Sequence, residues 1–170
     1  MESIKDEDQV NRVGQAFGIT FSVSGLALFN FFPELLGFSF VRNGEWVFMP
    51  ALSETFFTYL PWINLVWGAE IILSVFLLIL GHWQTATRWV SIAIKAFSVG
   101  LAGFMLAGLP LVGLNPAEIA ASGVGFPLEA ATVMVSLLNQ IVIFTLVLII
   151  VIDGFEIAKQ IYKFLRRNAL

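Results

Sequence analysis

The residue of this sequence best suited to chemistry is Glu70, an acid in the middle of the apolar run Pro61–Leu80. A charged side chain at the centre of a membrane-spanning helix costs about 2.5 to 3.5 kcal/mol on insertion scales, so neighbouring polar groups must satisfy it. Two interpretations stay open. Glu70 binds a proton or a cation, or it is a neutral, hydrogen-bonded acid that holds helices together, and the second is favoured.

Other polar residues are expected at a similar depth. Counting from the outer ends of their helices places Asn139 and Gln140 near the level of Glu70, with Ser74 one turn below it. We therefore predict an intramembrane polar cluster of Glu70, Ser74, Asn139 and Gln140. No second acid is expected at this depth, so the pattern does not indicate a proton relay.

A single lysine, Lys95, stands inside another apolar run, about 10 Å from Arg88 at the helical rise of 1.5 Å per residue. A turn over residues 81–88 would place Lys95 level with Ser74 and pointing away from Glu70. We therefore expect Lys95 to extend toward the inner membrane interface. The basic residues expected at that interface are Arg88, Lys95, Lys159, Lys163, Arg166 and Arg167.

Several kinds of chemistry are excluded or unsupported. The sequence has no cysteine and one histidine, His82, so it offers no disulfide, thiolate, cysteine-ligated metal or bis-histidine haem. It also shows no nucleophile–base pair, metal-ligand set or phosphate-binding loop. We predict no catalysis, metal, cofactor or nucleic-acid partner, with a membrane-embedded lipid or acyl enzyme as the exception that lone serines and acids leave open.

The elements that carry these residues are membrane helices. Of the 170 residues, 58% are hydrophobic and 12% charged, against about 25% charged in soluble domains. Apolar stretches near the length of about 20 residues that spans a bilayer cover residues 13–32, 61–80, 89–109 and 132–152. The prediction is an all-α integral membrane protein, a four-helix bundle over residues 13–152. The acidic residues 2–8 are unlike a cleaved signal peptide.

The orientation follows from the basic residues, which favour cytoplasmic loops. Seven lie in the N-terminal tail 1–12, the turn between the second and third runs, and the amphipathic tail 153–170, whereas the outer loops 33–60 and 110–131 hold only Arg42. Both termini are expected in the cytoplasm, in the plasma membrane of a bacterium. The bilayer is therefore the first predicted partner.

The outer loops contain local structure. Asn43-Gly44 between apolar β-formers predicts a hairpin in which Arg42 faces Glu45. The spacing after Pro50 predicts a short interfacial helix. In the second loop, a cap at Asn115 predicts another, with Pro116 first and Glu118 reaching back, followed by a breaker-rich turn over residues 123–127.

Small residues form one stripe on the third helix, which predicts close packing against a helix of the same chain or of another chain. The same chain is favoured, and a homo-oligomer or larger membrane complex is expected. The stripe comprises Ala96, Gly100, Gly103 and Ala107.

Motifs between residues 31 and 114 carry a family resemblance. They are Phe32-Pro33-Glu34-Leu35-Leu36-Gly37, the Asn43-Gly44-Glu45-Trp46 turn, the segment 60–67 beginning Leu60-Pro61-Trp62, and the segment 81–89 beginning Gly81-His82-Trp83. This order resembles the membrane part of bacterial multi-pass proteins of the HAAS-associated type, and it implies no active-site residues. The chain departs from the pattern because about a dozen residues precede the first helix and His82 stands where a basic residue is commoner.

Together these patterns predict a non-catalytic accessory, scaffolding or regulatory subunit of a membrane assembly. The alternative is a small transporter or channel protomer that uses Glu70.

Overall fold

The computed structural model describes residues 9–42, 44–122 and 125–168. Within them, four helices are long and apolar enough to cross a membrane: α2 (Arg12–Phe31), α3 (Glu54–Leu80), α4 (Thr85–Ala107) and α6 (Leu128–Asn168). The shorter elements are the 3₁₀ turn η1 (Pro33–Leu35), strands β1 (Gly37–Arg42) and β2 (Glu45–Pro50), and helix α5 (Pro116–Ala121). The predicted class, a mainly helical chain with four membrane-length helices and a hairpin, is confirmed.

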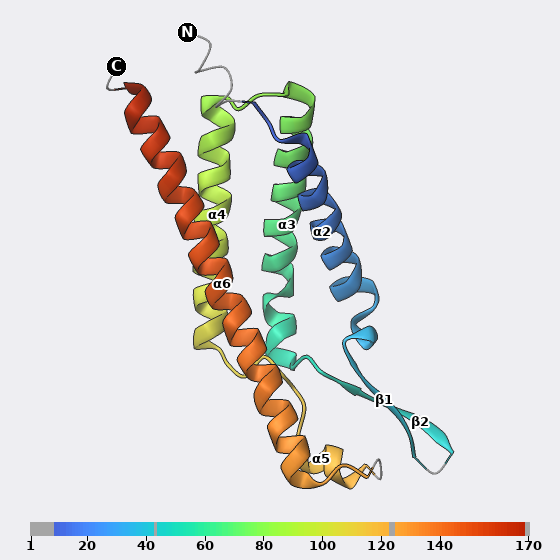
Figure 1. The fold of residues 1–170 in the computed structure, drawn as a ribbon. Coiled ribbons are helices and arrows are strands. Elements are labelled where there is room, and N and C mark those ends of the chain that lie inside the picture. Colours follow the sequence, from blue (N-terminus) through green and yellow to red (C-terminus); the bar gives the residue numbers. More distant parts are fainter. Residues whose placement is uncertain (1–8, 43, 123–124, 169–170) are drawn as a thin grey trace.

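The four long helices form a row in the order α2, α3, α4, α6 (Figure 1), and each contacts its neighbour in that order. The hairpin and α5 lie at one end of the helices, the bottom of Figure 1. Helix α2 begins and helix α6 ends at the opposite end. In the described part of the chain, no Cα atoms of α2 and α6 come within 8 Å of each other. The row is therefore open between α2 and α6, while Phe56 of α3, Met105 of α4 and Leu146 of α6 share one buried core, and the four-helix bundle in a membrane stays a prediction.

Helix α3 begins earlier than predicted. Ser53 caps it by accepting a hydrogen bond from the Phe56 backbone N–H at 3.3 Å, and the helix continues through Pro61 to Leu80. The separate interfacial helix predicted after Pro50 is therefore wrong. Pro61 removes one backbone hydrogen bond, a loss that membrane helices tolerate, and burial of Phe56 in the core holds the first turns in line with the rest.

Helix α4 also begins one turn before its predicted start at residue 89. The Thr87 hydroxyl accepts from the Gln84 backbone N–H at 3.0 Å and donates to the Gln84 carbonyl at 2.9 Å. These bonds satisfy backbone groups that a helix start leaves open. The polar residues before the apolar run are thus part of the helix. Each residue of α4 therefore lies one turn farther along α3 than predicted.

Helix α6 is 41 residues long, which corresponds to about 60 Å, twice the hydrocarbon thickness of about 30 Å. It is tilted relative to the other helices and crosses α4 (Figure 1). The predicted continuation of the fourth apolar run beyond Asp153 is confirmed. Residues 153–168 are the last turns of one helix, and its start at Leu128 precedes the predicted residue 132.

The hairpin agrees with its prediction. Strands β1 and β2 pair antiparallel in the register that sets Arg42 opposite Glu45, and Gly44 has the positive φ of +86° that the turn requires. Asn43 lies outside the described residues.

Helix α5 is capped as predicted, since the Asn115 side chain accepts from the Ala117 N–H at 3.0 Å. Glu118 reaches back, but to the Asn115 side-chain amide at 3.3 Å rather than to its backbone. Of the predicted turn into α6, residues 123 and 124 lie outside the described part of the chain, and Gly125 has a φ of +75°.

The two outer loops are joined by their backbones into an outer cap, residues 33–53 and 108–122. The Ser53 N–H donates to the Leu111 carbonyl, and the Gly113 N–H donates to the Ala51 carbonyl, both at 2.9 Å. A Cβ on Gly113 would lie 2.9 Å from the Ser53 Cα, so only glycine allows this approach. Leu111 is fully buried at the joint.

The small-residue stripe of α4 faces outward. Ala96, Gly100, Gly103 and Ala107 are all exposed, and a Cβ on either glycine would meet no atom of the described chain within 4 Å. Packing against a helix of the same chain, the favoured alternative, is therefore wrong. Helix α4 uses another face, which carries the buried Ala102, to pack within the chain.

Helices α2 and α3 are held together by a close approach and an amide pair. The Asn30 and Asn64 side-chain amides donate to each other's oxygens at 2.9 and 2.8 Å. At Gly25, an added Cβ would lie 2.8 Å from the ring of Trp67, whereas at Gly18 it would meet nothing within 4 Å. A methyl group therefore fits at Gly18, whereas at Gly25 it would clash with the Trp67 ring.

We expect Gly25→Ala to lower the free energy of unfolding by about 1 to 3 kcal/mol, because the methyl group would push Trp67 out of its packing. The matched change Gly18→Ala should raise stability by about 0.5 to 1 kcal/mol through helix propensity alone. Unfolding of both variants in mixed micelles measures this difference. Equal effects at the two positions would show that α2 does not lie against Trp67.

Candidate functional site

Two ion pairs join α4 to α6 inside the row. Lys95 Nζ lies 3.1 Å from Asp153 Oδ1 and 2.6 Å from Glu156 Oε2. The side chains of Lys95 and Asp153 are 18% and 12% exposed. Asp153 and Glu156 stand three residues apart, so they share one face of α6 and both reach the same ammonium group.

The expectation that Lys95 extends to the inner interface is therefore wrong. A lysine within an apolar helix either reaches water or pairs with an acid, and here α6 supplies two acids. The prediction missed them because it treated Asp153 as the first residue of a tail outside the membrane helices. In the structure, α6 passes Lys95 without interruption.

Glu70 belongs to the same region. It stands ten residues before Leu80, the end of α3, and Lys95 stands ten residues after Thr85, the start of α4, so each lies about 15 Å from the connecting turn. Lys95 is thus level with Glu70 and not with Ser74, contrary to the prediction. The earlier start of α4 accounts for the difference.

Lys95 is level with Glu70 on the neighbouring helix, and Asp153 and Glu156 of α6 reach the same lysine. Among the described residues, the Glu70 carboxylate makes no ion pair within 4 Å. We call Glu70, Lys95, Asp153 and Glu156 the charged cluster. It contains three acids and one base.

The predicted polar cluster is not assembled. The Asn139 side chain donates to the Val135 carbonyl of its own helix at 3.1 Å, and Gln140 is exposed. No Cα atoms of α3 and α6 come within 8 Å of each other in the described chain, so these residues lie away from Glu70 and from Ser74, which is half-buried one turn along α3. Counting depth from the outer ends failed because α4 lies between α3 and α6, so equal depth does not bring their side chains together.

The contact between α4 and α6 continues as a polar seam toward the end of the molecule where α2 begins and α6 ends, which we call the inner end after the predicted orientation. The Gln160 amide donates to the Ser91 hydroxyl at 3.1 Å, one turn beyond the ion pairs. Arg88, only 8% exposed, places its guanidinium carbon 6.0 Å from the Trp83 ring centroid. The seam comprises Arg88, Ser91 and Lys95 on α4 with Asp153, Glu156 and Gln160 on α6.

A sequence signal for this seam exists. Residues 88, 91 and 95, and residues 153, 156 and 160, both follow the spacing of three and four that marks one helix face. The first set is polar within a mainly apolar stretch of α4, and the second begins where the apolar run of α6 ends. Reading the two sets as facing each other would have found the partner of Lys95.

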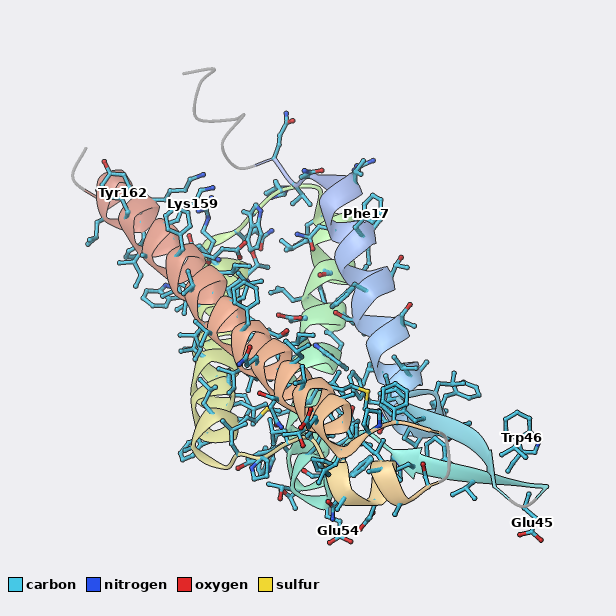
Figure 2. All side chains as sticks on the ribbon, turned by 60° about the horizontal axis from the view of Figure 1, so that its bottom comes forward. Phe17, Glu45, Trp46, Glu54, Lys159 and Tyr162 are labelled. Carbon is cyan, nitrogen blue, oxygen red and sulfur yellow. The ribbon has the colours of Figure 1, made fainter. Side chains whose placement is uncertain are left out.

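The remaining predicted basic residues lie at the inner end. Figure 2 shows Lys159 near the end of α6, opposite to the end that carries Glu45 and Glu54. Lys163 is half-buried, and Arg166 and Arg167 fall in the last turn of the helix. His82 is exposed in the turn between α3 and α4, with Nδ1 2.8 Å from the Leu80 carbonyl oxygen.

The charged cluster could do one of two things: hold α3, α4 and α6 in register, or exchange a proton or a cation. Within residues 9–42, 44–122 and 125–168, no three acids or histidines are grouped so that they could bind a metal ion.

Comparisons with protein-family models, with curated proteins and with solved structures gave no match to this chain. The resemblance to HAAS-associated proteins stays a prediction, and the case for function rests on the geometry.

We expect Lys95→Met to lower the free energy of unfolding by about 3 kcal/mol, since it leaves the buried Asp153 unpaired and removes the partner of the more exposed Glu156. Adding Asp153→Asn should restore part of the loss, with a coupling energy of about 0.5 to 3 kcal/mol in a double-mutant cycle. Arg12→Met, an exposed position on α2, serves as the control and should change stability by less than about 0.5 kcal/mol. A coupling energy of zero would mean that the ion pair does not fasten α4 to α6.

Proposed function

We propose that this chain is a non-catalytic subunit of a membrane assembly, with an accessory, scaffolding or regulatory role. The observation that carries the proposal is the open row of helices with the small-residue stripe of α4 on its outer face. Helices in lipid associate through close packing and not through the hydrophobic effect. A stripe without side-chain bulk therefore gains most from a helix supplied by another protein or by a second copy.

The charged cluster supports the same role. The intramembrane lysine is neutralised by two acids of the neighbouring helix, which is how a membrane protein fastens helices together. The joined outer loops support it as well, because an ordered cap offers a fixed surface outside the bilayer.

The location proposed is the plasma membrane of a bacterium, with both termini in the cytoplasm. The basic residues Arg12, Lys159 and Lys163 stand where α2 begins and α6 ends, and Glu45 and Glu54 stand at the opposite end (Figure 2). The excess of basic residues on the cytoplasmic side of membrane proteins supports this orientation.

A photo-crosslinking amino acid placed at Gly103 in native membranes should attach to one protein species, whereas the same probe at Gly18, an exposed glycine of α2, should attach to none. The reason is that α4 presents four small residues in one exposed stripe, whereas the exposed rings of Phe17 and Phe21 stand beside Gly18 on α2. Gels and mass spectrometry identify the attached species.

A companion variant, Gly103→Leu, should reduce co-purification of that species at least about tenfold, the loss that corresponds to about 1.4 kcal/mol. It should leave the stability of the isolated chain unchanged within about 0.5 kcal/mol. A chain that yields no crosslinked protein from position 103 is not a subunit bound through this stripe.

A second candidate is a small transporter or channel protomer. One observation favours it: the charged cluster holds three acids for one lysine, and Glu70 is the acid without an ion pair among the described residues. An intramembrane acid that is not neutralised by a neighbour is suited to take up and release a proton or a cation.

If Glu70 carries an ion, wild-type protein in liposomes should show flux under a proton or sodium gradient, and Glu70→Gln should lose at least about tenfold of it while folding normally. Glutamine keeps the size and hydrogen bonding of the side chain but not its ionisation. Glu54→Gln, in the exposed first turn of α3, is the control and should keep full flux. Wild-type liposomes without flux under either gradient would rule out transport.

A further inference from the structure

A hollow of about 200 Å³ opens at the inner end of the polar seam, between α4, α6 and the turn that precedes α4. It is lined by Trp83, Arg88, Glu156, Lys159, Gln160 and Lys163. Its position is that of the membrane interface, because Trp83 lies between the end of α3 and the start of α4, where the apolar runs stop.

The hollow has a positive character that two lysines establish. Lys159 and Lys163 are one helical turn apart and face it together, and neither makes an ion pair in the part of the chain that the structure describes. The one acid in the wall, Glu156, is 2.6 Å from Lys95, which it shares with Asp153, so its negative charge is partly offset. Two ammonium groups thus remain to meet an anion.

One buried acceptor adds a second requirement. The Gln160 Nε2 donates to Ser91, but Gln160 Oε1 is buried and has no hydrogen-bond partner among the described residues. Buried acceptors in folded proteins almost always find a donor. A ligand that carries a hydroxyl group beside its anionic group would supply one.

We propose that this hollow binds the head group of an anionic phospholipid, with Lys159 and Lys163 holding the phosphate and with a small rotation of the Gln160 side chain exposing Oε1 to a head-group hydroxyl. A basic hollow between membrane helices at the interface is a setting in which such head groups bind. The acyl chains would lie along the apolar surface of α4 and α6. Phosphatidylglycerol has both the phosphate and the hydroxyl. This inference goes beyond the subunit role, since a single copy of the chain contains the whole site.

The test uses the full chain in micelles with equal amounts of phosphatidylglycerol and phosphatidylcholine, and native mass spectrometry counts the lipids retained. Wild type should retain phosphatidylglycerol preferentially, and raising the salt concentration should weaken that preference. Lys159→Gln and Lys163→Gln should each weaken binding of phosphatidylglycerol about fivefold, the effect expected for one lysine near an anionic surface.

Arg12→Gln is the matched control. It removes one positive charge from the same end of the molecule but from α2, which does not contact α6, and it should keep the wild-type preference. Lys163→Arg keeps the charge and should also keep the preference. Inorganic phosphate at millimolar concentration should not displace the lipid.

Equal retention of the two lipids by wild type would overturn the proposal. So would an Arg12→Gln variant that loses as much preference as the lysine variants, since the effect would then be general charge. Displacement of the lipid by inorganic phosphate would make the ligand a free anion. Because wild type alone gives the salt dependence and the lipid preference, a poorly folded variant does not leave the question open.

Discussion

The position of Lys95 between Asp153 and Glu156 is the interaction on which the rest of the fold depends. A charge within an apolar helix must be matched by an opposite charge, and two acids on one face of α6 provide that match. The ion pairs determine which turn of α6 lies beside which turn of α4. Because α6 is far longer than the bilayer is thick, this register also determines how much of it projects at each end.

Helix α4 is fixed at both ends, and this leaves one face of it outward. At its inner half the polar seam joins it to α6, and at its outer end the segment that follows it is hydrogen-bonded to the residues before α3. Ala102 and Met105 are buried on the side of α4 that packs against the rest of the chain. The small-residue stripe is what remains, and it is exposed on the outer face of the row.

Features set by neighbouring residues were predictable from the sequence, whereas features set by helix register were not. The Asn43-Gly44 turn and the Asn115 cap depend on local backbone preferences, and the structure agrees with the prediction of the hairpin and of α5. The starts of α3 and α4 depend on polar caps outside the apolar runs, and hydropathy gives those residues no weight. An error of one turn was enough to move Lys95 from Glu70 to Ser74 and to hide the charged cluster.

Glu156 links the two ends of the polar seam. Its carboxylate is bound to Lys95 in the charged cluster, and its side chain is also part of the wall of the inner hollow beside Lys159. An anion held by Lys159 and Lys163 would repel that carboxylate and drive it toward Lys95, because like charges at such distances interact strongly outside bulk water. Occupation of the hollow would therefore strengthen the ion pairs that hold α4 to α6. With an anion in the hollow as proposed, Glu156 would thus couple the packing of α4 and α6 to the occupation of the hollow.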